Sequence, residues 1–497
     1  MKLAAAALFL VATLSIGARP AAGSTLPALP TTVRVNITGL GTTYAVIASS
    51  GTLSAIAPDG TLLYRGAGST LARTNVRSVL STGMELPEGD ASGPLTPAER
   101  ADRWAVRREA RTAIAEDGPG AIVTIPFRFS VLQGPDDAIG KVALEGDAIA
   151  GIRFATNDGI LTVNGRAYRG TFELAPDDEG DMIVVNEVST HDYLASVVGS
   201  EEPSSWEREA LAAQAIAART YLYTHLGRHR RYDLEGDTRD QEYDGTTSED
   251  PRALAAVERT AGLIATYRGA PIEALYSANA GGITEDSENV FVNALPYLRS
   301  VPSPTDEVAS RSSWGATSWK WTKELSAAQL RAQLERRGIR VGTPTAIQLT
   351  QLSATGRVLA ARIIGTDGSQ DIGKDRSRFY FGLQSTLFTV VATPTGANER
   401  VDAADAARIG ALETLGARIV ETESDLVLDA EGNELGLRAI AYRYELPARF
   451  VFTGRGSGHG VGMSQWGAQG MALAGASYQQ ILAHYYVGTG VTAVGGG

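Results

Sequence analysis

The sequence of 497 residues contains no cysteine and only 5 histidines. The absence of cysteine excludes disulfides, iron–sulfur clusters, cysteine-bound zinc and a cysteine nucleophile. So few histidines leave little material for a multi-histidine metal centre, and we expect no metal and no other cofactor. The chain has 45 basic and 56 acidic residues, for a net charge of −11. Without a long basic run it lacks the Lys and Arg contacts that supply most of the affinity for nucleic acid.

Long apolar runs are also missing, because no stretch beyond the N-terminus reaches the roughly 18 apolar residues of a membrane-spanning helix. At the N-terminus, Lys2 precedes an apolar run from Leu3 to Gly17, and small residues follow at 21–23. This order predicts a signal peptide over 1–23, cut somewhere within 18–24; a buried helix and a membrane anchor are the alternatives. We therefore expect a secreted protein of the bacterial periplasm or cell wall, without a stable membrane span and held by its core alone.

The pattern of apolar residues predicts an α+β fold. Short alternating runs broken by glycine-containing turns indicate a β-rich N-terminal region over 24–160, which includes a charged surface helix over 96–116. Strands and helices are mixed from 161 to 490, and we expect one core there. Residues 393–445 look like an insertion, with a helical segment over 402–415 and a hairpin around 431–433.

Capping residues mark the expected helix starts. Ser204 with Glu207 forms the pattern of a capping box and predicts a helix to about Thr224. Its apolar stripe is rich in alanine, so a neighbouring element can approach closely. Other starts are expected at Ser189, Asp250–Pro251, Ser326 with Gln329, and Ser477 with Gln480.

A glycine-rich segment over 454–462 has glycine at every second position, which permits positive φ and a close approach of ligand to backbone N–H groups. It is not a dinucleotide-binding loop, because Val461 stands where the third glycine is required. The segment is either a substrate-binding wall that presents His459 or a tight turn with a surface histidine. A second segment, 368–375, approaches a P-loop, but Asp375 replaces the hydroxyl that meets Mg²⁺, and we expect a plain loop.

Glu201 and Glu202 are adjacent carboxylates between two predicted helices. Neighbouring residues point in different directions, so we do not expect both to face one cleft. They form either a solvated helix junction or a site with one carboxylic acid of raised pKa, as cleavage of a glycosidic bond requires. The polar segment 237–245 either binds sugar hydroxyls or is a solvated loop, and 276–282 is a bend or a ligand-facing loop. No serine-hydrolase elbow and no His-Glu-x-x-His motif is present.

Taken together, these segments resemble the SpoIID/LytB family, which comprises the sporulation stage II protein D and amidase-enhancer proteins. The matching stretches occur in one order: VNGRAYRG, DYLASVVGSEEP, EALAAQAIAARTY, SGHGVGMSQWGA and HYYVGT, at 163–170, 192–203, 209–221, 457–468 and 484–489. The likeness covers roughly 160–300, 314–390 and 447–490. It leaves out the N-terminal region and the 393–445 insertion.

The resemblance implies a SpoIID-like catalytic core and a peptidoglycan lytic transglycosylase. Such an enzyme cleaves the MurNAc–GlcNAc β-1,4 bond of peptide-stripped glycan and leaves 1,6-anhydroMurNAc ends, in cell-wall remodelling or sporulation-like processes. The family's catalytic glutamate, in its Glu-Met-Pro step, corresponds to Glu201, with Glu202 in place of Met. A second carboxylate so close either favours the protonated acid or makes the assignment ambiguous. Zinc-binding members use Cys and His where Ala278, Asn279 and Ala280 stand here, so no zinc is expected.

Further residues are expected to hold the glycan: Gln214, Arg219, Gln241, Tyr243, Ser277, His459, Gly460, Ser464 and Gln465. The expected partners are glycan strands and a cell-wall amidase. A non-catalytic, wall-binding amidase enhancer is the first alternative, because that branch shares the motifs, and an envelope scaffold is the second. The net charge of −11 implies that wall binding rests on hydrogen bonds and stacking rather than on attraction to an anionic polymer.

Overall fold

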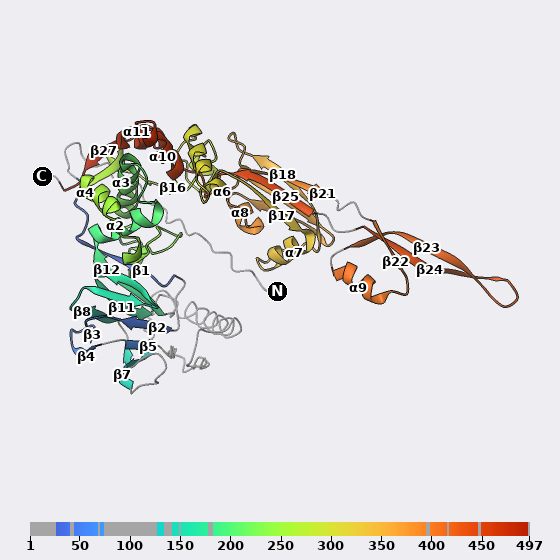
Figure 1. Cartoon of the computed structure of the whole chain (residues 1–497), viewed down its shortest axis with the longest axis horizontal. Helices are drawn as coiled ribbons and strands as arrows, with labels where there is room; N and C mark the ends of the chain where they lie inside the picture. Colours follow the sequence, from blue (N-terminus) through green and yellow to red (C-terminus); the bar gives the residue numbers. More distant parts are fainter. Residues whose placement is uncertain are drawn as a thin grey trace, which may run out of the picture. The chain divides into compact units, whose positions relative to one another are not determined.

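The computed structural model describes residues 26–39, 44–67, 70–73, 127–133, 142–148, 151–176, 182–393, 398–414, 417–445 and 449–495. The predicted signal peptide and the predicted helix over 96–116 lie outside these residues. Helices and several sheets are both present, which confirms the α+β class (Figure 1). The chain forms two compact units: a C-terminal unit, Ala274–Gly490, and an N-terminal unit up to Glu273 that also contains the residues from Val491 onward.

Two antiparallel-rich sheets form the first part of the N-terminal unit. One has the strand order β13-β1-β12-β11-β8-β3-β4 and the other β10-β9-β2-β5-β6-β7. Alternating burial in β1 and β3 indicates that one face of each strand packs into the core. The strands are β1 (Thr32–Asn36), β2 (Tyr44–Ala48), β3 (Thr52–Ile56), β4 (Leu62–Ala67), β5 (Thr70–Arg73), β6 (Phe127–Gln133), β7 (Val142–Ala148), β8 (Ile152–Thr156), β9 (Ile160–Val163), β10 (Arg166–Arg169), β11 (Thr171–Pro176), β12 (Met182–Ser189) and β13 (Leu234–Glu235).

The strands predicted before and after residue 160 share these sheets. β1 pairs with β12 from Thr32↔Ser189 to Asn36↔Val185, and β2 pairs with β9 at Ile47↔Val163. The β-rich region is thus continuous with the strand that leads into the first helix of the expected core. The boundary between the two compact units falls instead after Glu273.

Helices complete the N-terminal unit: α2 (Thr190–Glu201), α3 (Arg208–His225), α4 (Pro251–Arg259) and the 3-10 turn η1 (Gly245–Ser248). A small sheet, β15-β14-β27, is formed by β14 (Leu263–Tyr267), β15 (Ala270–Pro271) and β27 (Gly490–Ala493). The predicted caps of two helices are confirmed, because Ser189 accepts from the Asp192 amide and Asp250 from the Arg252 amide.

The predicted capping box at Ser204 is wrong. α3 begins at Arg208 with Glu207 as its N-cap, and no side chain caps it. The reason is a turn that includes Ser204, in which the Trp206 N–H donates to the Pro203 carbonyl. Trp206, only 6% exposed, packs into the core and holds this turn in place.

Helix α3 is buried on every side rather than along one stripe. All side chains from Ala210 to Leu222 are buried, because the helix contacts α2, α4 and β14. A helix enclosed in this way needs small residues. Six of these positions are alanine, each 0% exposed: Ala210, Ala212, Ala213, Ala215, Ala217 and Ala218.

The C-terminal unit contains three small sheets, with orders β17-β25-β21, β18-β19-β20 and β16-β26. Both capping boxes expected in this unit, at Ser326 with Gln329 and at Ser477 with Gln480, are present. The elements are β16 (Tyr276–Ser277), α5 (Ser287–Val290), η2 (Pro304–Arg311), α6 (Ala316–Trp319), β17 (Lys320–Ser326), α7 (Ala327–Glu335), β18 (Pro344–Leu352), β19 (Val358–Gly365), β20 (Gly368–Gly373), α8 (Arg376–Phe381), β21 (Phe388–Thr393), β25 (Arg449–Arg455), β26 (Met463–Ser464), α10 (Gln465–Leu473) and α11 (Tyr478–Tyr485).

The P-loop-like segment is not the loop that we predicted. Its first six residues form β20, which pairs with β19 from Ala360↔Gly373 to Gly365↔Gly368. Exposed polar residues are compatible with a strand here because β20 lies at the edge of its sheet.

The insertion has its own sheet, β22-β24-β23, and its own small core. It consists of β22 (Asn398–Asp402), α9 (Ala406–Thr414), β23 (Arg418–Leu428) and β24 (Glu434–Glu445). The hairpin predicted around 431–433 is confirmed, with Asp429 accepting from the Glu431 and Asn433 amides. Its helix starts later than expected, because Asp402 and Asp405 each bind a following backbone amide.

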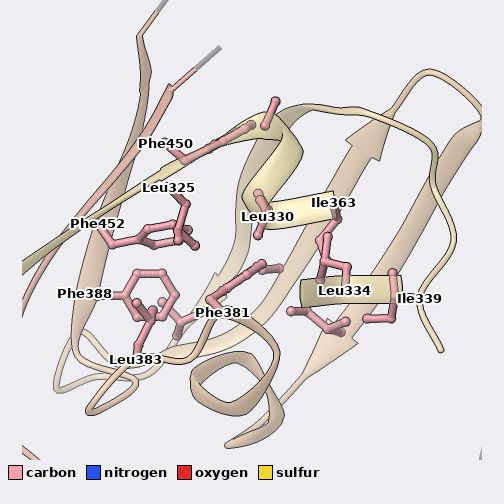
Figure 2. Close-up of a cluster of buried hydrophobic side chains, with 14 of the residues drawn as sticks. Leu325, Leu330, Leu334, Ile339, Ile363, Phe381, Leu383, Phe388, Phe450 and Phe452 are labelled. Atoms are coloured by element: carbon pink, nitrogen blue, oxygen red, sulfur yellow. The ribbon is translucent and has the colours of Figure 1, made fainter. Parts of the chain in front are cut away.

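An aromatic cluster forms the centre of the C-terminal unit (Figure 2). The rings of Phe381 and Phe452 lie 5.2 Å apart and those of Phe388 and Phe452 5.9 Å apart. Aliphatic side chains from α7 and β19 close the cluster, including Leu330, Leu334 and Ile363. No helix in the described part of the chain is long and apolar enough to cross a membrane.

Replacing Phe452 with Ala tests this core. The side chain is fully buried, and we expect the substitution to lower the free energy of unfolding by about 3–5 kcal/mol. Urea unfolding followed by tryptophan fluorescence measures the change, since Trp321 lies in the same cluster. Leu437→Ala is the control, because Leu437 is 74% exposed and its removal should change stability by no more than about 0.5 kcal/mol. Equal effects of the two substitutions would contradict the assignment of this core.

Candidate functional site

The predicted site residues divide between the two units. Five of them belong to the N-terminal unit: Glu201, Gln214, Arg219, Gln241 and Tyr243. The other five belong to the C-terminal unit: Ser277, His459, Gly460, Ser464 and Gln465. Each unit therefore has its own candidate site, which we call the carboxylate site and the glycine-rich site.

Glu201 is the last residue of α2, and its side chain is half-buried. Its Oε1 accepts a hydrogen bond of 3.1 Å from the Glu242 backbone N–H. The preceding Ser200 donates to Ser248 Oγ and accepts from the Asp244 N–H. The end of α2 is thus fastened to the segment 242–248, and the carboxylate of Glu201 has a defined position.

Glu202 lies in a different environment from its neighbour. The residue is 1% exposed, and neither carboxylate oxygen has a hydrogen-bond partner among the described residues. Burial raises the pKa of Glu202 well above its usual value, and the nearby Glu201 adds to this effect. Burial therefore favours the protonated form of Glu202, whereas Glu201 keeps part of its surface exposed. That only one of the two faces a substrate cleft stays a prediction.

Gln241 and Tyr243 are enclosed behind the segment that binds Glu201. Gln241 accepts from the Tyr193 hydroxyl at 3.1 Å, and the Tyr243 hydroxyl donates to Asn186 Oδ1 at 2.7 Å. Both are almost completely buried. Their contacts fix the segment on which Glu242 lies, and a direct contact with glycan stays a prediction for both.

Gln214 and Arg219 both lie on the enclosed helix α3. Arg219 donates to Thr260 Oγ1 and to the carbonyls of Leu263 and Val257, so it ties α3 to the end of α4 and the start of β14. Burial lowers its pKa to about 10. Gln214 is 0% exposed, and its amide has no hydrogen-bond partner among the described residues. Contact of either with glycan also remains a prediction.

Glu242 is a feature of the carboxylate site that sequence reasoning missed. Its side chain is half-buried, and burial raises its pKa, with further contributions from the negative charges of Asp244 and Asp237. Arg166 pairs with Asp244 at 2.6 Å. In the structure, buried Gln241 and Tyr243 alternate with half-exposed Glu242 and Asp244, as in an extended segment with one face outward. The same alternation of residue types in the sequence could have pointed to Glu242.

The glycine-rich site is built by backbone contact. Gly456, Gly458, Gly460 and Gly462 all have positive φ, between 73° and 100°. Ser457 exchanges two hydrogen bonds with Asn279, and the Gly460 carbonyl accepts from the Glu285 N–H at 2.8 Å. The loop therefore lies along the segment 275–285, and β16 pairs with β26 in parallel. A Cβ at Gly458 would lie 2.7 Å from the Ser277 Cβ, so glycine is required there.

His459 is presented from the centre of this loop. Its Nδ1 accepts from the Val461 N–H at 3.0 Å, so the ring proton is on Nε2. The ring meets that of Phe291 edge to face at 5.4 Å. The residue keeps part of its surface exposed, but the surrounding protein lowers its pKa to about 4. His459 is consequently a neutral hydrogen-bond donor at pH 7.

Ser464 and Gln465 begin α10 and are buried. Ser464 donates to Asp306, which also accepts from Ser303 Oγ and the Gly282 N–H at 2.9 Å each. Sequence reasoning missed this buried Asp306, whose pKa is raised mainly by burial. The Oγ of Ser277 has no hydrogen-bond partner among the described residues. As glycan contacts, these side chains stay predictions.

Sequence reasoning also missed Arg357, which packs against the glycine-rich loop. The residue is 1% exposed and donates to the Ala280 carbonyl. Its guanidinium occupies the space that a Cβ at Gly460 would need, which explains why residue 460 is glycine. Burial lowers the pKa of Arg357 to about 10. No local sequence pattern around residue 357 predicts this role.

Asn279 stands at one of the positions where we expected no zinc ligand, and its side chain makes other contacts. Asn279 accepts from the Gly281 N–H at 2.8 Å and donates to the Asp306 carbonyl at 3.2 Å. Within the described ranges, no group of three or more His, Asp or Glu side chains is arranged to hold a metal ion.

Comparison with known proteins places the carboxylate site in context. The sequence model of the family described as "Stage II sporulation protein" matches residues 178–267, which contain the carboxylate site. A model of a domain of unknown function, DUF8618, matches 305–403. An uncharacterised protein of Brachyspira hyodysenteriae is 31% identical over 344 residues, 69% of this chain and 76% of that protein.

Two relatives from Bacillus subtilis have informative names. Stage II sporulation protein D is 28% identical over 326 residues, covering 62% of this chain and 76% of that protein. The amidase enhancer is 28% identical over 305 residues, covering 60% of this chain but only 40% of that longer protein.

Replacing Glu202 with Met tests the enclosed carboxyl. Because its pKa in the folded chain lies above the unfolded value of 4.5, the stability linked to this group is complete below that pH and is lost as the pH rises toward the folded pKa. We expect the stability of Glu202→Met relative to the unsubstituted chain to rise by at least about 1 kcal/mol from pH 4.5 to pH 8. Urea unfolding at a series of pH values measures the difference, from which all other titrations cancel.

The matched control is Leu437→Met, because Leu437 is 74% exposed and neither side chain ionises. Its stability difference should stay level across the same pH range. A level difference for Glu202→Met as well would show that Glu202 ionises freely in the folded chain.

Proposed function

The chain belongs to the SpoIID/LytB family, and from that premise we propose that it is a secreted peptidoglycan lytic transglycosylase with Glu201 as its catalytic acid. The substrate is the MurNAc–GlcNAc β-1,4 bond of peptide-stripped glycan, and the product carries a 1,6-anhydroMurNAc end. The observation that carries the proposal is the contrast between the two carboxyls. Glu201 is accessible and positioned by a backbone amide, whereas Glu202 is enclosed.

The reaction uses one carboxyl group twice. Glu201 donates its proton to the glycosidic oxygen while the bond between that oxygen and C1 of MurNAc breaks. The C6 hydroxyl of the same MurNAc then attacks C1, and its proton passes to the Glu201 carboxylate. The acid is thereby regenerated, and no water is consumed. A second catalytic carboxylate is therefore not required, in contrast to ordinary glycosidases.

The surroundings of Glu201 favour this role. The Glu242 N–H at 3.1 Å orients its carboxylate toward one position. The pKa of Glu242 itself is raised by burial, which limits repulsion between the two carboxylates when substrate excludes water. Ser200 and Ser248 hold the end of α2, so the acid does not shift as it loses and regains its proton.

We assign glycan contacts in the glycine-rich site to His459 first, with Gly460, Ser464, Gln465 and Ser277. The neutral His459 can donate from Nε2 to a sugar oxygen. In the carboxylate site, Arg219, Gln241 and Tyr243 act on the glycan mainly through the segments that they hold. Gln214 is assigned a direct contact with the glycan.

A second candidate function is supported by the similarity to the Bacillus subtilis amidase enhancer. In that case the protein binds wall glycan and increases the activity of a cell-wall amidase without cleaving glycan itself. The same two sites would serve, with Glu201 as a glycan ligand instead of an acid.

The test is Glu201→Gln on purified, peptide-free glycan strands, with products identified by mass spectrometry. We expect the substitution to lower the rate of formation of 1,6-anhydroMurNAc ends by about 10²–10⁴-fold. Glu242→Gln is the matched comparison, because it removes a neighbouring carboxyl, and it should retain most of the activity.

Unchanged anhydro product from Glu201→Gln would overturn the assignment, and loss in Glu242→Gln alone would move the acid to Glu242. Reducing-end sugars from the unsubstituted chain would indicate a hydrolase. No glycan product, together with faster amidase cleavage, would establish the enhancer function instead.

A further inference from the structure

A hollow of about 520 Å³ lies over the sheet β17-β25-β21 of the C-terminal unit. Its volume is within the range of small-ligand sites. The floor includes Trp321 and Gly454, where the Trp321 ring occupies the space beside the glycine backbone. Gly454 is also the first residue of the glycine-rich segment, so the hollow opens where the strand β25 runs into that segment.

Two cations stand opposite each other at this hollow. Lys320 and Arg455 are direct partners in the pairing of β17 with β25, and both side chains are exposed. Like charges directly opposite in a sheet repel each other. The described part of the chain contains no ion pair with either residue, whereas Arg449, on the same strand β25, pairs with Glu324 at 3.2 Å. In a chain of net charge −11, this unneutralised pair needs an explanation.

Trp319 lies against both cations, although it does not line the hollow. Its ring lies 5.7 Å from Lys320 Nζ and 6.0 Å from Arg455 Cζ, so it contacts both cations. The residue is only 8% exposed, and its indole Nε1 has no acceptor among the described residues. A buried N–H without an acceptor is costly, and it lies beside the two cations.

The rest of the rim is suited to a sugar. Thr322, Thr389 and Thr453 are exposed residues that line the same hollow, and Thr322 pairs with Thr453 across the strands. Their hydroxyls can donate to and accept from sugar hydroxyls. The core residues Trp321 and Phe388 alternate with these threonines along the strands, and Figure 2 shows Phe388 in the aromatic cluster.

From this juxtaposition we infer that the hollow binds a singly charged oxyanion carried by a wall saccharide, held between Lys320 and Arg455 and surrounded by the three threonines. The inference rests on the proposed function for the identity of the saccharide. In peptide-free glycan, the oxyanion is the lactyl carboxylate of MurNAc, and a stem peptide converts that carboxylate into an uncharged amide. The other source of the same chemistry is the phosphodiester of an anionic wall polymer.

Binding measurements on the full chain distinguish these sources. The chain carries Glu201→Gln to prevent cleavage, and isothermal titration calorimetry compares three probes. The first is a peptide-free tetrasaccharide of alternating GlcNAc and MurNAc. The second is tetra-N-acetylchitotetraose, which has the same backbone without lactyl groups. The third is a poly(glycerol phosphate) of defined length.

We expect the MurNAc tetrasaccharide to bind at least about tenfold more tightly than chitotetraose, because charge-assisted hydrogen bonds are stronger than neutral ones. Lys320→Gln and Arg455→Gln should each remove about five- to tenfold of this preference, and the double variant should bind both sugars equally. The matched control, Arg449→Gln, loses the same charge from the same strand and should keep the preference.

Several results would overturn the inference. Equal binding of the two sugars by the chain with intact Lys320 and Arg455 would do so, and this measurement does not depend on how the variants fold. Loss of the preference in Arg449→Gln would indicate a general charge effect. If only poly(glycerol phosphate) binds tightly, and the double variant abolishes this binding, the ligand of the hollow is a phosphodiester and not the lactyl carboxylate.

Failure of the proposed function is distinguishable from failure of this site. If the unsubstituted chain cleaves glycan but does not distinguish the two sugars, the proposed enzyme function is supported and the hollow has another role. If the chain cleaves nothing and still prefers the MurNAc sugar through Lys320 and Arg455, the binding site is supported and the protein is a wall-binding protein.

Discussion

Close approach between backbone segments is the constraint on which both candidate sites depend. A Cβ at Gly199 would collide with the Ser248 carbonyl, and a Cβ at Gly245 with the Ala167 carbonyl. The segment 242–248 can therefore meet the end of α2 and strand β10 only without side chains at these glycines. In the glycine-rich site, Gly458 and Gly460 allow the same contact with Ser277 and Arg357. The alanines of α3 extend this principle to the helix behind the carboxylate site. Substituents at these positions would separate the segments that position Glu201 and His459.

The buried polar groups explain why so few side chains remain available for chemistry. Arg219 and Asp306 are buried with several hydrogen bonds each, so they stabilise the connections between elements. Glu202 and Gln214 are buried without partners among the described residues, which lowers stability and is typical of functional regions rather than of a plain core. Because burial raises the pKa of Glu202, it also disfavours a second negative charge next to Glu201. The substitution of Met by Glu at this step is thus compatible with an acid at residue 201.

Local signals in the sequence predicted local structure well. The caps at Ser189, Asp250, Ser326 and Ser477 depend on residues three or fewer positions apart, and they are present. The cap at Ser204 failed because the burial of Trp206, a tertiary effect, selects a turn instead. Likewise, the spacing of Glu201 and Glu202 indicated that they face different ways, but not which of them is enclosed. Asp306 and Arg357 were missed because their partners are distant in sequence, such as Ser464 and Ala280.

The net charge of the chain led us to expect wall binding by hydrogen bonds and stacking, without attraction to an anionic polymer. The position of Lys320 opposite Arg455 qualifies that argument. Net charge governs the field far from the protein, but in physiological salt such a field is screened beyond about 8 Å. At contact distance, the local charge of Lys320 and Arg455 outweighs the distant net charge in the site that we propose. An acidic protein with one basic hollow repels a polyanion at long range and still accepts a single carboxylate at one point. That combination suits a glycan whose charges are spaced by neutral sugars better than a polymer with a charge on every unit.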